Sequence, residues 1–166
     1  MHLMDFIQRT SAAQVEEGTS LAPRLDADGL IPVVTTDQTT GEVLMMGVMT
    51  AKALRLTIKT GTAHYWSRSR RCLWHKGATS GLVQRVVEAR IDDDQDAVWQ
   101  REKVSGGASC HVGYRSALQL TVPMGQAGPL RSVGHVHGIT GPLHGGLHAS
   151  LHGGLCRGRQ GGLVFR

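Results

Sequence analysis

The hydrophobic positions between Gly29 and Thr50 fall into two short runs that a polar stretch separates. The runs read "LIPVVTT" and "EVLMMGVM", and both are rich in the β-branched and apolar side chains typical of strands. Residues 37–41 between them contain the Asp, Thr and Gly residues that suit a hairpin connection. The pattern therefore predicts that residues 31–36 and 43–48 are paired strands.

A helical pattern follows directly in "TAKALRLTIKTG". Thr50 suits the N-cap position, Leu54 and Ile58 are one helical turn apart, and Gly61 stands where helices commonly end. This segment is the clearest predicted helix of the chain.

Three further strands are predicted after this helix. The first covers residues 63–67 and leads into a basic loop rich in Ser, Thr and Gly. The second covers residues 83–91, and its imperfect alternation of apolar and polar residues indicates a bulge. The third covers residues 97–104. The acidic positions between the last two strands then form a hairpin tip, and a Gly-rich loop with Cys110 and His111 follows.

The first twenty residues show a weaker helical pattern. Leu3, Phe6 and Ile7 would share one side of a helix, and Gly18 is available to end it. We therefore expect a short amphipathic helix within residues 1–20.

Length and composition set the domain organisation. The 166 residues suffice for one domain with a core, which we place at residues 21–123 and assign to the α+β class as a compact mixed sheet with a short helix. Twelve of the 22 glycines and four arginines, but no acidic residue, lie in residues 124–166. That composition predicts a disordered Gly/His-rich tail. Two further hypotheses for the tail stay open: its spaced histidines bind metal adventitiously, or the C-terminal sequence is misread.

Charge and cysteine content narrow the class of protein. The net charge of +5 belongs mainly to the tail, so the folded part is nearly neutral and has no extended basic stripe. The three cysteines have no regular spacing, which predicts no disulfide framework. No signal peptide and no apolar run of about 18 residues is apparent. We expect a cytoplasmic protein without membrane or nucleic-acid partners.

The acidic run "DDDQD" is the first candidate for chemistry. Asp92, Asp94 and Asp96 alternate, so in an extended segment their carboxylates would project to one side, away from Asp93. Close carboxylates need a compensating cation, and Mg²⁺ prefers oxygen ligands. The alternative is a solvated polar turn, in which Asp is common.

Two other stretches carry candidate residues. Cys110 and His111 could bind zinc or move protons, although a lone cysteine is more often a small core residue. The segment "YWSRSRRCLWHKGATSG" combines arginines and a lysine with hydroxyls and glycines, which suits the binding of a phosphorylated ligand. The same residues could serve a nucleic-acid surface, on which Trp66 and Trp74 would stack bases.

Taken together, these stretches resemble the phosphoribosyl-AMP cyclohydrolases of histidine biosynthesis from about Gly29 to Val122. The specific parts are "GLIPVV", "TGEVLMMGVM", "TGTAHYWSRSRRCLWHKGATSG", "QRVVEARIDDDQDA" and "SCHVG". The resemblance implies a hydrolase that opens the adenine ring at its N1–C6 bond. It also implies an intertwined homodimer with zinc ligands from both chains, and a small-molecule nucleotide substrate.

The site residues follow from matching the family pattern Asp-Cys-Asp-x-Asp. The resemblance implies that Asp92, Asp94 and Asp96 bind Mg²⁺ and that Cys110 binds Zn²⁺. Asp93 stands where the family has another zinc cysteine, and it is the candidate second ligand of an altered zinc site because a carboxylate can still bind Zn²⁺. Ala117 stands at the third zinc position, where alanine offers no ligand atom. The change from the family's "RSCFYR" to "RSALQL" makes a reading-frame disturbance near this position a further explanation.

The remaining roles rest on the resemblance for the proton shuttle, and on side-chain chemistry and position in the matching run for the substrate contacts. His111 is the expected proton shuttle, and the candidates for contacts with the substrate phosphate or base are Arg68, Ser69, Lys76 and Ser80. Three hypotheses remain: an active cyclohydrolase with an altered zinc site, a degenerate paralogue that binds the nucleotide without turnover, and a basic nucleic-acid-binding module.

Overall fold

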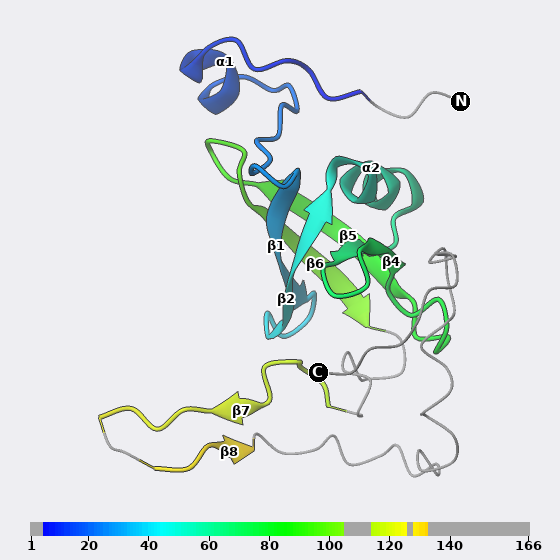
Figure 1. Cartoon of the computed structure of the whole chain (residues 1–166), viewed down its shortest axis with the longest axis vertical. Helices are drawn as coiled ribbons and strands as arrows, with labels where there is room; N and C mark the ends of the chain where they lie inside the picture. Colours follow the sequence, from blue (N-terminus) through cyan, green and yellow to red (C-terminus); the bar gives the residue numbers. More distant parts are fainter. Residues whose placement is uncertain (1–4, 105–113, 126–127, 133–166) are drawn as a thin grey trace.

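The computed structural model describes residues 5–104, 114–125 and 128–132. The described residues form two helices and eight strands in a mixed α+β arrangement, as the sequence predicts (Figure 1). The elements are α1 Ala12–Glu16, β1 Leu30–Asp37, β2 Val43–Thr50, α2 Ala51–Thr60, β3 His64–Ser67, β4 Cys72–His75, β5 Gln84–Ile91, β6 Val98–Val104, β7 Leu120–Thr121 and β8 Arg131–Ser132.

A four-stranded sheet in the order β2-β1-β6-β5 forms the centre of the fold. The predicted hairpins β1–β2 and β5–β6 are both antiparallel, whereas β1 and β6 pair in parallel. The register of β5 on β6 shifts between Val86 and Glu88, which confirms the predicted bulge. The parallel pairing places the start of β1 and the start of β6 at the same end of the sheet.

One face of this sheet carries the hydrophobic core. Helix α2 packs on β2 and β3 beside that face (Figure 1). Its predicted ends are confirmed, because the Thr50 hydroxyl caps Ala53 N–H and Gly61 takes the left-handed conformation. Leu54 is buried, whereas Ile58, one helical turn further along, is 40% exposed. The buried cluster consists of Ile31, Val33, Met45, Met49, Ala53, Leu54, Ala63, Tyr65 and Val98.

The opposite face of the sheet lacks such a cover in the described part of the chain. Met46 is 66% exposed there, and its register partner Val34 lies beside Trp99. A pocket of about 370 Å³ opens on this face and is lined mostly by apolar side chains, together with the charged residues Arg90 and Asp92. The sheet thus presents an apolar surface that reaches the acidic loop.

The N-terminal segment differs from its prediction. Within the described residues the helix covers only Ala12–Glu16, because Ser11 accepts the Gln14 N–H and so begins the helix there. Phe6 precedes the helix in extended chain and packs against the core, with the Arg55 guanidinium 4.3 Å from its ring centroid. Phe6 therefore contacts the core from a non-helical segment, whereas Ile7 is 42% exposed and Leu3 lies outside the described residues.

Three other features depart from expectation. Strand β4 lies within the predicted basic loop and pairs with β3. Strand β8 pairs with β7, so the tail predicted to begin at residue 124 contains a short ladder in its described part. Cys72 takes part in a disulfide bond, although the cysteine spacing predicted no disulfide framework; the other cysteines lie outside the described residues. Among the described residues no helix has the length and apolar composition needed to cross a bilayer.

Candidate metal and substrate site

The acidic loop between β5 and β6 is a turn that Asp92 organises. Its Oδ1 accepts the backbone N–H groups of Asp96 at 2.8 Å and Ala97 at 2.9 Å, and its carbonyl accepts Gln95 N–H at 3.1 Å. Gln95 has φ of 57°, in the left-handed region. The predicted hairpin tip is confirmed, but this turn and not the alternation of an extended strand brings the aspartates together.

The turn gathers the three predicted magnesium ligands. Asp92, Asp94 and Asp96 each offer a carboxylate oxygen, and these atoms all lie within 4.8 Å of one another. Asp93 is exposed and does not belong to this group. The carboxylates are partly open to solvent, with 38% of the Asp94 side chain and 39% of the Asp96 side chain exposed.

Arg24 supplies the positive charge that faces this cluster. Its Nη2 contacts Oδ2 of Asp94 at 2.5 Å and also hydrogen-bonds Oδ2 of Asp96. The hydrogen bond from Arg24 lowers the pKa of Asp96, although partial desolvation opposes it. Partial desolvation, followed by the charge of Asp96, raises the pKa of Asp94. The arginine therefore occupies the position that a cation would take between two carboxylates.

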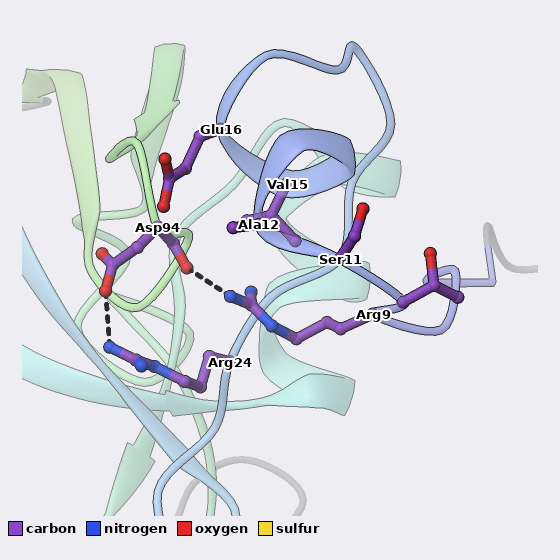
Figure 2. Close-up of a pocket in the computed structure, with 8 residues that line it drawn as sticks. Arg9, Ser11, Ala12, Val15, Glu16, Arg24 and Asp94 are labelled. Atoms are coloured by element: carbon purple, nitrogen blue, oxygen red, sulfur yellow. Dashed lines mark hydrogen bonds and ion pairs between the residues drawn. The ribbon is translucent and has the colours of Figure 1, made fainter.

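Sequence reasoning missed the residues that surround the loop from the N-terminal segment. Arg9 donates from Nη1 to the Ala22 carbonyl at 2.7 Å and from Nη2 to the Asp94 carbonyl at 2.9 Å. Arg9, Arg24 and Asp94 line a pocket of about 360 Å³ beside α1 (Figure 2). A local sequence pattern cannot predict these contacts, because Arg9 and Asp94 are 85 positions apart.

The zinc positions do not fit the family's three-thiolate site. Cys110 and His111 lie outside the described residues. Ala117 is exposed, its methyl group offers no ligand, and its N–H donates to the Leu44 carbonyl at 2.7 Å. That contact places Ala117 beside the first residues of β2, at the end of the sheet opposite the acidic loop. Asp93 and Ala117 therefore cannot share a ligand sphere within one chain.

The predicted substrate-binding residues belong to the turns that flank β4. Arg68 and Ser69 lie in the turn between β3 and β4, where Ser67 and Ser69 place their Oγ atoms 3.5 Å apart. Lys76 and Ser80 lie in the turn that follows β4. The structure therefore divides the four candidates into two pairs at opposite ends of the β3–β4 hairpin.

The ring of Trp74 lies between basic side chains from these two turns. The Arg70 guanidinium is 5.6 Å and the Lys76 ammonium 4.9 Å from its centroid. Beside it, His64 and His75 stack with their ring centroids 4.3 Å apart, and burial lowers the pKa of His64. The hairpin therefore presents basic side chains next to packed aromatic rings.

The turn after β4 is far from the acidic loop of the same chain. Strand β5 begins at Gln84, after this turn, and ends at Ile91, before the acidic loop. Its eight residues span roughly 25 Å at about 3.3 Å per residue. A ligand held at Lys76 and Ser80 would therefore not reach the aspartates of the same chain.

Comparison with known proteins adds to this geometry. A sequence model of the family described as phosphoribosyl-AMP cyclohydrolase matches residues 45–119. A Rhodopseudomonas palustris protein of that name is 58% identical over 104 residues, which are 63% of this chain and 71% of the relative. A Brucella canis relative is 54% identical over 112 residues, 67% of this chain and 81% of the relative. A Nitrobacter hamburgensis relative is 51% identical over 122 residues, covering 74% and 82%.

The α+β fold with its carboxylate cluster and these relatives define a hydrolase domain. The match includes the acidic loop, the β3–β4 hairpin and Ala117. The chain belongs to the phosphoribosyl-AMP cyclohydrolase family.

Proposed function

We propose that the protein hydrolyses the adenine ring of phosphoribosyl-AMP at an Mg²⁺ site made by Asp92, Asp94 and Asp96. The main support for this proposal is that one carboxylate oxygen from each of the three residues lies within 4.8 Å of the others, in a chain of this family. In the reaction, water adds its oxygen to the carbon between N1 and the exocyclic amine. The N1–C6 bond then breaks as this oxygen becomes the carbonyl oxygen of a carboxamide. One proton of the water goes to N1, and the other goes to the exocyclic nitrogen, which becomes the amide NH₂.

The carboxylates fit a magnesium ion on chemical grounds. Mg²⁺ takes oxygen ligands and is commonly held by a few carboxylates together with water. The Arg24 contact with Asp94 and Asp96 supports the proposal, because these oxygens already accept a positive group. When bound, the ion would lower the pKa of a coordinated water and neutralise the cluster. Asp92 would contribute one oxygen while its Oδ1 holds the turn.

The two turns of the hairpin fit the two phosphate groups of the substrate. Phosphoribosyl-AMP carries one phosphate on its AMP part and one on its phosphoribosyl part. We infer that Arg68 and Ser69 bind one of them and that Lys76 and Ser80 bind the other. The separation of the pairs along the hairpin supports this division. His111 stays the predicted proton shuttle.

The distance between the acidic loop and the other candidate site residues of the same chain also supports a homodimer. Lys76, Ser80 and Ala117 lie at the end of the sheet opposite the acidic loop. A second copy would bring these residues to the aspartates of the first. The open sheet face around Met46 and Trp99 supplies an apolar surface for such a copy. The cytoplasmic location stays a prediction.

A second candidate function rests on Ala117. Because the zinc positions do not fit, the chain could bind the nucleotide without hydrolysing it. The carboxylates and the hairpin would then still hold the substrate and Mg²⁺. Binding without turnover is therefore the alternative that the missing ligand favours.

One experiment tests both functions. The purified full chain is incubated with phosphoribosyl-AMP and Mg²⁺, with and without added Zn²⁺, and ring opening is followed by the change in absorbance. Turnover above the Asp94→Asn variant is expected. Nucleotide binding by calorimetry without turnover in any metal condition would replace the first function by the second, and absence of both would contradict each.

A further inference from the structure

Gln95 ties the acidic loop to the N-terminal segment, residues 5–25. Its side chain is 5% exposed, and Oε1 accepts the Ala22 N–H at 2.7 Å. Nε2 donates to the Val15 carbonyl at 3.1 Å and to the Ser20 carbonyl at 3.2 Å. Both amide hydrogens are therefore used, and both acceptors belong to a segment more than seventy positions away.

The backbone of Gln95 makes a further tie. Its carbonyl accepts the Arg24 N–H at 2.7 Å. The same short segment thus fixes the Gln95 side chain through its peptide groups and delivers the guanidinium of Arg24 to Asp94 and Asp96. Arg9 reinforces the connection through the Ala22 and Asp94 carbonyls.

This burial is unusual for the middle of an exposed turn. Gln95 stands between two partly exposed aspartates, yet it points inward while they point outward. A glutamine in the left-handed region is uncommon, so surrounding contacts must hold it there. The three side-chain hydrogen bonds to the N-terminal segment are the contacts that do so.

We propose that Gln95 is a positioning residue that sets the spacing of the metal-binding aspartates by clamping their loop onto the N-terminal segment. The inference rests on the proposed Mg²⁺ site. Groups that orient metal ligands commonly change metal affinity by about 10- to 100-fold when they are removed. The N-terminal segment is then part of the metal site, although none of its side chains contributes a ligand.

The test separates the clamp from the backbone conformation. Gln95→Gly keeps a residue that readily adopts φ of 57° and removes the side chain. Gln95→Asn also tolerates the left-handed region, but it is one methylene too short for the three carbonyl and amide contacts. Mn²⁺ serves as the probe ion for the full-length chain, with free Mn²⁺ measured by electron paramagnetic resonance and Mg²⁺ added as competitor.

Thr57→Ala provides the matched control. Thr57 is buried and its Oγ1 bonds the backbone N and O of His64, so this variant also loses buried hydrogen bonds without touching the acidic loop. All three variants are expected to have lower thermal midpoints than the wild-type chain. Only the two Gln95 variants should bind Mn²⁺ about tenfold more weakly or worse.

The possible outcomes are distinct. Wild-type Mn²⁺ affinity in a folded Gln95→Gly or Gln95→Asn variant would overturn the inference and leave the proposed function intact. An equal loss of affinity in Thr57→Ala would also overturn it, because general destabilisation would then be the cause. Absence of Mn²⁺ binding by the wild-type chain would instead overturn the proposed metal site itself. If the Gln95 variants fail to fold, Arg9→Ala carries the test, with weaker Mn²⁺ binding expected.

Discussion

The hydroxyl of Tyr65 donates a hydrogen bond of 2.9 Å to Oε1 of Glu102 within the buried side of the sheet. Glu102 is fully buried, and its Oε2 has no hydrogen-bond partner among the described residues. Burial raises the pKa of Glu102 from its ordinary 4.5 to about 7, although the Tyr65 hydrogen bond and the charge of Lys76 oppose the shift. The folded protein therefore holds this proton more tightly than the unfolded chain does.

The first prediction is a loss of stability with rising pH. Through Glu102, the free energy of unfolding falls as the pH rises from about 4.5 to about 7, and it stays lower above that. Glu102→Gln keeps an acceptor for Tyr65 and removes the charge. We expect it to stabilise the protein on the order of 3 kcal/mol at pH 8 and hardly at all near pH 4.5, in urea unfolding experiments.

Glu88→Gln is the control for this pH dependence. Hydrogen bonds from Arg90 and Arg101 lower the pKa of Glu88, so its charged form stabilises the fold. Neutralising it should therefore destabilise the protein at pH 8, the opposite sign to Glu102→Gln. Equal effects of the two substitutions would contradict the assignment to burial.

The second prediction concerns the acidic loop. Asp94→Asn replaces a proposed metal-binding carboxylate with a neutral amide and keeps the hydrogen bonds that Asp92 makes to the turn. We expect turnover to fall at least about 100-fold, a loss comparable to that of other groups acting on transition-state charge, while the thermal midpoint changes little. Asp28→Asn, at an exposed carboxylate outside the loop, should leave both quantities unchanged. A variant at Asp94 that keeps wild-type turnover would contradict the proposed site.

The third prediction follows from the contact of Arg24 with Asp94 and Asp96. In Arg24→Gln the cluster loses its cation, so without Mg²⁺ the thermal midpoint should fall. Added Mg²⁺ should then raise the midpoint by more than in the wild-type chain, because no guanidinium has to leave. Arg85→Gln, at an exposed position on β5, should respond to Mg²⁺ as the wild type does. An equal Mg²⁺ response in Arg24→Gln would show that arginine and metal do not compete.

The fourth prediction compares two glycines of the turn after β4. A Cβ at Gly77 would lie 2.0 Å from the Leu82 carbonyl oxygen, and φ is 81°. Gly81 has φ of 74° with no atom within 4 Å of the added carbon. Gly81→Ala should therefore cost about 1 kcal/mol of stability. Gly77→Ala should cost more and also weaken nucleotide binding at Lys76, as calorimetry and urea unfolding would measure; equal costs would contradict the contact.

The fifth prediction addresses the missing zinc ligand. Ala117→Cys should raise the zinc content per chain, measured by elemental analysis, and should increase turnover if a second copy places this residue near Cys110. Leu118→Cys, which adds a thiol at the exposed neighbouring position, is the matched control. Unchanged zinc content and turnover in Ala117→Cys would mean that the site uses a different ligand set.

Local patterns predicted the elements whose ends are fixed by their own residues. Helix α2 begins at the Thr50 cap and ends at Gly61, and the β1–β2 hairpin forms around its polar connection. Strand β4 was missed because all four of its residues are half-buried, so its sequence shows no alternation. The parallel pairing of β1 with β6 was equally invisible, since it depends on segments far apart in the chain.

For the candidate site, too, local patterns predicted some residues and could not predict those that depend on distant segments. The aspartates could be selected from their spacing, yet the reason given for their convergence was wrong, because Asp92 and Gln95 build a turn. Arg24 could not be found, since it meets Asp94 across 70 positions. The separation of Lys76 from the acidic loop likewise follows from the direction of β5 and not from composition.

The parallel contact between β1 and β6 has a consequence for synthesis of the chain. Strand β1 has β2 on one edge soon after both leave the ribosome, but its other edge stays without a partner until β6 has been made. An unpaired strand edge is a template for association with other chains. A ribosome that stalls before Val98 would therefore leave a nascent chain that aggregates through β1, and this long-range closure should make the β1–β6 pairing a slow step of folding.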